Sequence, residues 1–215
     1  MNIITHSISF ANQDLVLTNK RAIYWSAQSL LILSDLHLGK ASHFRKNGIA
    51  IPTTVNDVDL QTLERLILHF NPKKVLFVGD LIHSKSNKEV VLFKDFISKH
   101  SPVEFLLVKG NHDRVSATFL QQLGISKVVD ALEIDGIIFS HEPTLNPKQT
   151  VICGHIHPGI RIILPNKKAL RMPCFVVAQN QIILPAFSLF TGLDTRQAND
   201  NVTFYAFDDN DFYVF

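Results

Sequence analysis

The 215-residue chain is poor in cysteine and carries little excess charge. Its two cysteines, Cys153 and Cys174, have neither disulfide nor zinc-ribbon spacing and lie in apolar, strand-like stretches, so we expect buried, reduced thiols. The formal net charge of +2 is far from the strongly basic balance of a dedicated nucleic-acid-binding domain. Charge alone therefore indicates no partner.

The sequence also lacks a long apolar run. Residues 1–7 carry neither the basic nor the apolar segment of a signal peptide, and no later stretch reaches the length of a membrane-spanning helix. No internal repeat, low-complexity tract or interdomain linker interrupts the chain. We therefore expect one domain over residues 1–215, a cytoplasmic location and no membrane contact, with the oligomeric state left open.

Short apolar runs that lead into polar residues recur along the chain. The run 75–78 is rich in strand formers, too short for a globular helix, and ends at Gly79-Asp80, which indicates a buried parallel strand. Similar runs occur at 30–33, 105–108, 137–139 and 151–153. A Gly-Asp turn after one strand is common, but the recurrence of this pattern favours a shared site at the carboxyl ends of the strands.

The remaining sequence predicts helices between these strands and further strands after them. Alternating residues over 8–25 predict a short antiparallel meander. Apolar residues at helical spacing, each series followed by a proline or glycine, predict helices over 52–70, 89–100 and 116–123. Strand-like runs follow at 160–163, 174–177, 181–184 and 202–205. We expect an α/β fold with mixed sheets and helices outside them.

The polar residues after the five runs include enough donors for two metal ions. The candidate ligands are Asp35, His37, Asp80, Asn111, His141, His155 and His157. Phosphate chemistry at a dinuclear centre requires a bridging carboxylate, hard oxygen ligands and neutral imidazoles. The mixture of nitrogen and oxygen donors favours manganese, with zinc, iron and nickel as alternatives, over calcium.

Five motifs, taken in order, resemble those of the calcineurin-like metallophosphoesterase superfamily. They are Asp35-Leu36-His37, Gly79-Asp80-Leu81-Ile82-His83, Gly110-Asn111-His112-Asp113, His141 and Gly154-His155-Ile156-His157. The resemblance implies a four-layer α-β-β-α sandwich of two mixed sheets flanked by helices. It also implies phosphoester hydrolysis by a hydroxide that bridges two metal ions.

The same resemblance implies a role for each motif residue. One metal is held by Asp35, His37, Asp80 and His157, and the other by Asp80, Asn111, His141 and His155, so that Asp80 bridges the two. His112 stabilises or protonates the leaving oxygen, and Asp113 orients the imidazole. His83 fits two interpretations, an orienting contact to a ligand or a structural histidine near the site.

A closer resemblance, to the bacterial ligase-associated DNA damage response endonucleases, covers nearly the whole chain. It rests on residues 35–40 with Phe44-Arg45, on His83 where many relatives have aspartate, and on residues 185–192. It implies a phosphodiesterase that cleaves DNA in repair, with a DNA ligase and a helicase as partners. Arg45 and His83 then become candidate substrate-binding residues. The departure from this family is Leu193-Asp194, where relatives often have a second glycine.

The basic segment after His37 has two interpretations. Lys40, His43, Arg45 and Lys46 are suited to binding substrate phosphates. An ordinary solvated helix turn accounts for these residues equally well.

Three other functions compete with a DNA endonuclease. A phosphodiesterase for a small nucleotide or a lipid-linked diphosphate uses the same metal core. A phosphoprotein phosphatase is disfavoured, because Asp80 lacks the arginine that follows it in that family and Asp113 stands where that family has glutamate. A non-catalytic protein-binding scaffold is disfavoured because every expected metal ligand is present.

Overall fold

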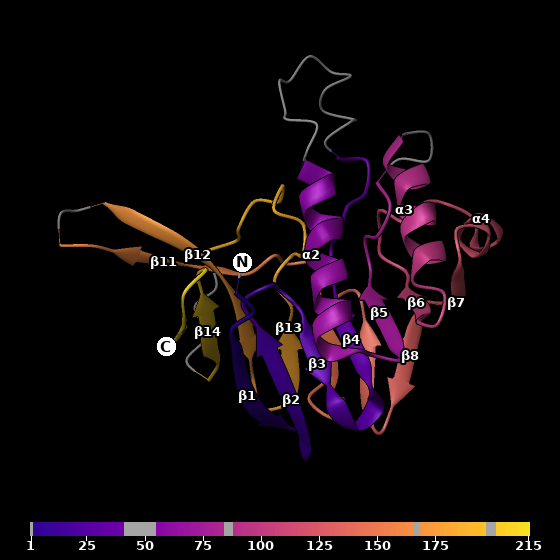
Figure 1. Ribbon diagram of the computed structural model, residues 1–215. Coiled ribbons are helices and arrows are strands. Elements are labelled where there is room, and N and C mark those ends of the chain that lie inside the picture. Colours follow the sequence, from indigo (N-terminus) through magenta and orange to yellow (C-terminus); the bar gives the residue numbers. More distant parts are fainter. Residues whose placement is uncertain (1, 41–54, 84–87, 166–167, 197–200) are drawn as a thin grey trace.

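The computed structural model describes residues 2–40, 55–83, 88–165, 168–196 and 201–215. Its strands form two mixed sheets that pack face to face, and helices cover the outer face of the first sheet (Figure 1). This arrangement confirms the predicted α/β sandwich. No helix within the described ranges is long and apolar enough to span a membrane.

The first sheet combines an antiparallel half with a parallel half. In order across the sheet its strands are β1 (Thr5–Phe10), β2 (Gln13–Thr18), β3 (Ile23–Trp25), β4 (Leu30–Leu33), β5 (Lys74–Val78), β6 (Glu104–Val108) and β7 (Ile125–Val129). Strands β1 to β4 are antiparallel neighbours, as the predicted meander requires, and β4 to β7 are parallel. The parallel half aligns the carboxyl ends of β4, β5 and β6.

The second sheet carries the later part of the chain. Its strands are β8 (Ala131–Ile134), β9 (Ile137–Ser140), β10 (Val151–Cys153), β11 (Gly159–Ile163), β12 (Ala169–Val177), β13 (Gln181–Ile183), β14 (Thr203–Phe207) and β15 (Phe212–Val214). Strand β10 lies parallel to β9 and β13, while β11 pairs only with β12 in an antiparallel hairpin. Strands β7, β8 and β15 were not predicted from the sequence.

Among the described residues, three helices connect the parallel strands: α2 (Val55–Phe70), α3 (Lys88–Lys99) and α4 (Ala117–Gln122). They agree with the predicted helices where the structure describes them, although the expected start of the first, at 52–54, lies outside the described residues. Ser116 caps α4 by accepting a hydrogen bond from the Phe119 N–H. Gly124 then ends the helix with a left-handed backbone (φ +101°).

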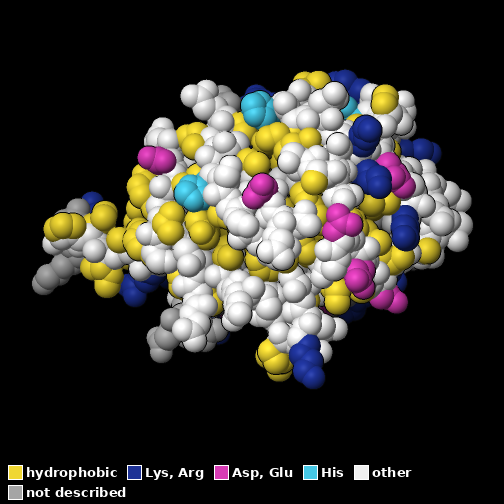
Figure 2. All heavy atoms as spheres, turned by 90° about the horizontal axis from the view of Figure 1, so that it is seen from below, with side chains coloured by type: hydrophobic (Ala, Val, Ile, Leu, Met, Phe, Trp, Pro, Cys, Tyr) yellow, Lys and Arg dark blue, Asp and Glu magenta, His cyan; other side chains and the backbone are white. Residues whose placement is uncertain are grey.

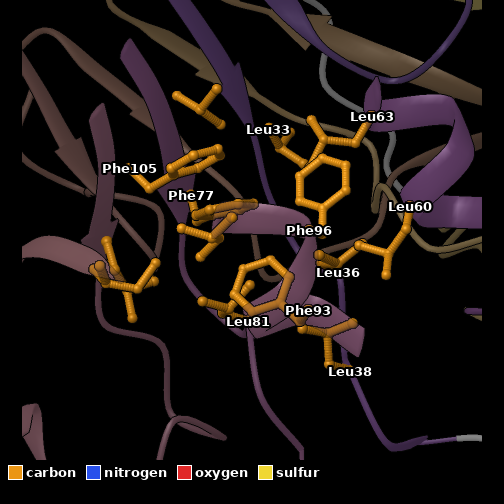
Figure 3. Packing of buried hydrophobic residues seen from close by; sticks show 14 of the residues in the cluster. Leu33, Leu36, Leu38, Leu60, Leu63, Phe77, Leu81, Phe93, Phe96 and Phe105 are labelled. Carbon is orange, nitrogen blue, oxygen red and sulfur yellow. The ribbon is translucent and has the colours of Figure 1, made fainter. Parts of the chain in front are cut away.

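Two apolar cores hold the layers together. Leu31 and Leu33 of β4 face the helices, and Figure 3 shows Phe77 of β5 packed there with Phe93 and Phe96 of α3. Leu30, Ile32 and the other alternate residues of the parallel strands face the second sheet. Burial of both faces explains why these strands read as continuous apolar runs.

The outer face of the second sheet carries a third, smaller apolar cluster. Cys153 and Cys174 belong to it, and burial raises the pKa of each thiol to about 12. Both are free, which confirms the prediction of buried, reduced cysteines. Among the described residues no helix lies over this face, where the resemblance implied the fourth layer.

Candidate metal centre

The candidate ligands gather where the carboxyl ends of the two sheets meet. Asp35 follows β4 and Asp80 follows β5, while His141 follows β9 and His155 follows β10. Backbone hydrogen bonds connect these strand ends, including Asp35 N–H to Gly79 O (3.1 Å) and Gly154 N–H to His141 O (3.0 Å). The sheets therefore bring together residues that are more than 100 positions apart in the sequence.

The first ligand group consists of Asp35, His37 and His157, with one donor atom of each inside a 4.8 Å span. His157 Nε2 lies 3.1 Å from Asp35 Oδ1 and 3.4 Å from His37 Nε2. The Ser34 hydroxyl donates to Asp35 Oδ2, which turns Oδ1 toward the histidines. Sequence reasoning missed Ser34, although it directly precedes a predicted ligand.

The second ligand group consists of Asp80, His141 and His155, which meet the same 4.8 Å limit. His141 Nε2 lies 3.4 Å from Asp80 Oδ2, 3.2 Å from His155 Nδ1 and 3.2 Å from Asn111 Oδ1. The other ring nitrogen, His141 Nδ1, is 3.1 Å from the backbone oxygen of Val78. A hydrogen bond there directs Nε2 toward the group, as carbonyl partners of metal-binding histidines commonly do.

The donor chemistry of both groups fits divalent metal ions. Asp35 Oδ1 is buried and accepts no well-oriented hydrogen bond from the described residues. Imidazole nitrogens face one another at 3.4 Å in the first group and 3.2 Å in the second, a separation that needs a proton or a cation to be favourable. Carboxylate and imidazole donors are typical ligands of manganese and related transition metals.

Backbone strain is concentrated at the candidate ligands. Asp35, His37, Asp80, His155 and His157 all have positive φ, between 50° and 70°. Such values are uncommon for residues other than glycine, and strained conformations cluster at functional sites. The surrounding hydrogen bonds and packing hold each side chain at the junction of the sheets.

Glycines permit the close approach of the strand ends. A Cβ on Gly79 would overlap His141 Nδ1, and a Cβ on Gly154 would overlap the Ser34 hydroxyl. Neither position accepts a side chain without displacing a candidate ligand or its partner. Gly79 and Gly154 therefore turn the chain and also let the opposite sheet approach closely.

The two ligand groups differ in protonation. Burial and the charge of Lys40 lower the pKa of His37 to about 3, so its imidazole is neutral at pH 7. Burial would lower the pKa of His141 as well, but its hydrogen bond and charge pairing with Asp80 raise it to about 9. The second group therefore holds a proton at neutral pH that a metal must displace.

The carboxylates are ionised despite their burial. Burial alone would raise the pKa of Asp35 and Asp80. Interactions with His157 bring the pKa of Asp35 below its usual value, and the hydrogen bond with His141 brings that of Asp80 to about 2. Both carboxylates thus carry the negative charge that metal binding requires.

His112 and His83 lie at the entrance to the centre. The exposed His112 ring is 5.9 Å from the His37 ring and 5.2 Å from the His83 ring, measured between centroids. The His112 N–H donates to Asp80 Oδ1 (2.9 Å), which fixes its position beside the second group. The structure thus brings both predicted residues next to the ligands.

The sequence predicts that Asp113 orients the His112 imidazole, and in this structure the contacts of Asp113 are to the backbone. Asp113 is buried, and its two carboxylate oxygens accept the backbone N–H groups of Ile82 (2.8 Å) and Gly110 (2.9 Å). No hydrogen bond between Asp113 and the His112 ring occurs among the described residues. Asp113 instead fixes the loop that carries Asn111 and His112.

Of the basic segment, the structure describes only Lys40. This half-buried side chain has its pKa lowered by burial, an effect that the charges of Asp35 and Asp80 oppose. The interaction places the ammonium near both ligand groups. His43, Arg45 and Lys46 lie outside the described residues, so the predicted role of Arg45 stays a prediction.

We expect Gly79→Ala to remove metal from the second ligand group, because the new methyl group would displace His141. Gly136→Ala is the matched control, since Gly136 also has positive φ (+78°) but a methyl group there would meet no atom within 4 Å. Elemental analysis after equilibration with manganese gives the occupancy. Equal metal content in the two variants would show that this close approach does not position the ligand.

We also expect metal binding to the second group to release about one proton near neutral pH, because His141 must lose the proton retained by its pKa of about 9. Affinity should then increase about tenfold per pH unit up to that value. Calorimetric titration with manganese in buffers of different ionisation enthalpy counts the protons. A proton count that stays at zero from pH 7 to 9 would contradict the assignment.

Comparison with known proteins agrees with this geometry. The nuclease MPE of Pseudomonas putida is 27% identical with a TM-score of 0.81, and the match covers 94% of this chain and 96% of that one. The phosphoesterase Yfce of E. coli is 12% identical (TM-score 0.43; 84% and 88% covered), and an archaeal phosphodiesterase is 14% identical (TM-score 0.39; 86% and 98% covered). No curated protein matches. The family model described as calcineurin-like phosphoesterase matches residues 29–174, well over half of the sequence and all of both ligand groups, so the chain belongs to the calcineurin-like phosphoesterase family.

Proposed function

We propose that this metal-dependent phosphodiesterase is a nuclease that cleaves DNA internally. The observation that carries the proposal is the pair of ligand groups at the junction of the sheets, with the exposed His112 imidazole beside them. The similarity to a Pseudomonas putida nuclease over 94% of the chain supports a nucleic-acid substrate. A non-catalytic scaffold has no need for this complete set of donors.

We propose two divalent transition-metal ions as cofactors, preferably manganese, with zinc, iron or nickel as alternatives. Asp35, His37 and His157 would hold one, and Asn111, His141 and His155 the other, with Asp80 shared between them. Bound there, the metals would supply Lewis acidity toward the phosphoryl oxygens and activation of water. The donor types and their grouping within 4.8 Å support this assignment.

His112 is the proposed general acid. Its backbone is fixed by the hydrogen bond to Asp80, and its exposed ring is free to face a bound phosphodiester. Protonation of the departing oxygen by this imidazole would avoid the release of an unstable alkoxide. Asp113 supports the step indirectly, because its two backbone hydrogen bonds fix the loop.

Lys40 and His83 are the proposed contacts to the substrate. The Lys40 ammonium lies near two buried carboxylates, where it would also attract phosphoryl oxygens. The His83 ring is 5.2 Å from that of His112, at the same entrance. Arg45 is retained as a further substrate contact on the sequence resemblance alone.

The cellular role is proposed from the sequence resemblance. Residues 35–40 and 185–192 are similar to those of the ligase-associated endonucleases. We therefore propose a cytoplasmic enzyme of DNA repair that acts with a DNA ligase and a helicase.

A metal-by-substrate matrix tests the proposed activity. Manganese, zinc, magnesium and nickel are each combined with a nitrophenyl diester, a nitrophenyl monoester, cyclic nucleotides, and linear and circular DNA. We expect cleavage of the diester and of circular DNA, strongest with manganese. Activity confined to cyclic nucleotides would instead assign a small-nucleotide phosphodiesterase, and activity confined to the monoester would exclude a diesterase.

The general-acid assignment predicts a dependence on the leaving group. His112→Ala should retain metal but slow DNA cleavage by roughly 10²- to 10⁴-fold, because a sugar alkoxide needs a proton to depart. Hydrolysis of a nitrophenyl diester should be only modestly impaired, because nitrophenolate departs without one. The measurement is kcat/KM on both diesters at full metal occupancy. Equal losses on both substrates would exclude His112 as the acid.

A further inference from the structure

The hairpin of β11 and β12, described over residues 159–165 and 168–173, forms an arm that begins beside the candidate metal centre. Figure 1 shows it projecting away from the two sheets. Gly159 comes two residues after His157, and its N–H donates to Asp194 O (2.9 Å). Asp194 N–H in turn donates to His157 O (2.9 Å). The backbone of Asp194 therefore links the base of the arm to His157, a candidate ligand of the first group.

Two exposed arginines occupy directly opposed positions on this arm. Arg161 of β11 pairs in register with Arg171 of β12, so both side chains project from the same face. Like charges directly across two strands destabilise a hairpin unless an anion neutralises them. Neither arginine forms an ion pair with a described residue.

Two of the acidic groups that line a pocket with Arg171 have cationic partners. Asp194 pairs with Arg196 through two hydrogen bonds of 2.8 and 3.0 Å, and Asp209 pairs with Lys20 at 2.8 Å. Asp208 accepts hydrogen bonds from two nearby backbone N–H groups and from the Tyr213 hydroxyl. Neither Arg161 nor Arg171 is ion-paired with these groups, so both guanidinium groups can bind an external anion.

Packing fixes the direction of the arginine face. Ile160, Ile162 and Met172 alternate with the arginines and pack against the third apolar cluster. Because successive residues of a strand point to opposite sides, the arginines face away from that cluster. The arm cannot turn its arginines inward without exposing these apolar side chains.

An open hollow of about 530 Å³ connects the arm to the first ligand group. Its lining includes His157, Arg171, Asp194, Thr195 and Arg196. Arg161 lies four residues after His157, which at roughly 3.3 Å per strand residue is at most about 13 Å along the chain. An extended polynucleotide can span this distance.

The opposite end of the molecule has a different charge arrangement. Figure 2, which looks at the end away from the metal centre, shows lysine and arginine side chains interspersed with aspartate and glutamate. On the arm, Arg161 and Arg171 form no ion pair with a described residue, although Asp59, Asp208 and Asp209 line a pocket with Arg171.

We propose that the arm binds the sugar–phosphate backbone of a polynucleotide through Arg161 and Arg171. The nucleotides between these contacts and the scissile phosphate occupy the hollow beside His157. Arginine forks suit bidentate contacts to phosphate oxygens. This inference rests on the proposed nuclease function and assigns the residues that separate polymer from small-diester substrates.

The test compares Arg161→Ala/Arg171→Ala with Lys73→Ala/Lys127→Ala, a control that also removes two exposed positive charges but lies on β7 and before β5. The arginine variant should raise KM for single-stranded DNA by about tenfold. It should also reduce the slope of log affinity against log salt by about 1.4, at about 0.7 per lost phosphate contact. The arginine variant should keep the wild-type kcat/KM on the nitrophenyl diester. The lysine control should match the wild type in KM for DNA, in salt dependence and in diester hydrolysis.

Three outcomes would overturn the proposal in distinguishable ways. If wild type hydrolyses the small diester but no polynucleotide, the nuclease function itself fails, and the role of the arm fails with it. If wild type cleaves DNA and the arginine variant equals the lysine control, only the arm assignment is wrong. If the arginine variant loses self-association while DNA cleavage is unchanged, the arm is instead an interface between copies of this chain.

Discussion

The contact between His141 and the first sheet is the constraint on which the candidate centre depends. His141 follows a strand of the second sheet, yet its Nδ1 lies 3.1 Å from Val78 O in the first, over a glycine that leaves no room for a side chain. This contact orients Nε2 toward Asp80. The apolar core between the sheets sets their spacing, and the glycines then allow their ends to approach closely enough for ligands from both sheets to meet.

The residues around this junction have different roles. Buried carboxylates with buried and half-buried imidazoles form the two ligand groups, whereas His112 beside them is exposed. Asp113 fixes the intervening loop through backbone contacts and so supports both. The arm that follows His157 extends the same site outward with two arginines that form no ion pair with a described residue. In this account the two ligand groups act on one phosphate, and the arm binds the rest of a polynucleotide.

The sequence indicated the candidate ligands that the structure brings together, because each follows a buried strand whose apolar run is easily recognised. Strand β8 was not predicted. Its residues alternate between exposed and partly buried, so its sequence does not form a clear apolar run. The roles of Asp113 and of the opposed arginines were missed for a different reason. The hydrogen bond between Asp113 and Ile82 depends on the tertiary fold. The pairing of Arg161 with Arg171 depends on the register of two strands. Residue spacing along the chain reveals neither.

The most direct test of the central claim is an anomalous-diffraction map from crystals of the protein grown with manganese. The account predicts two peaks about 3.5–4 Å apart. One should lie among Asp35, His37 and His157, and the other among Asp80, His141 and His155. A single peak, or manganese bound only outside these two ligand groups, would contradict the dinuclear centre.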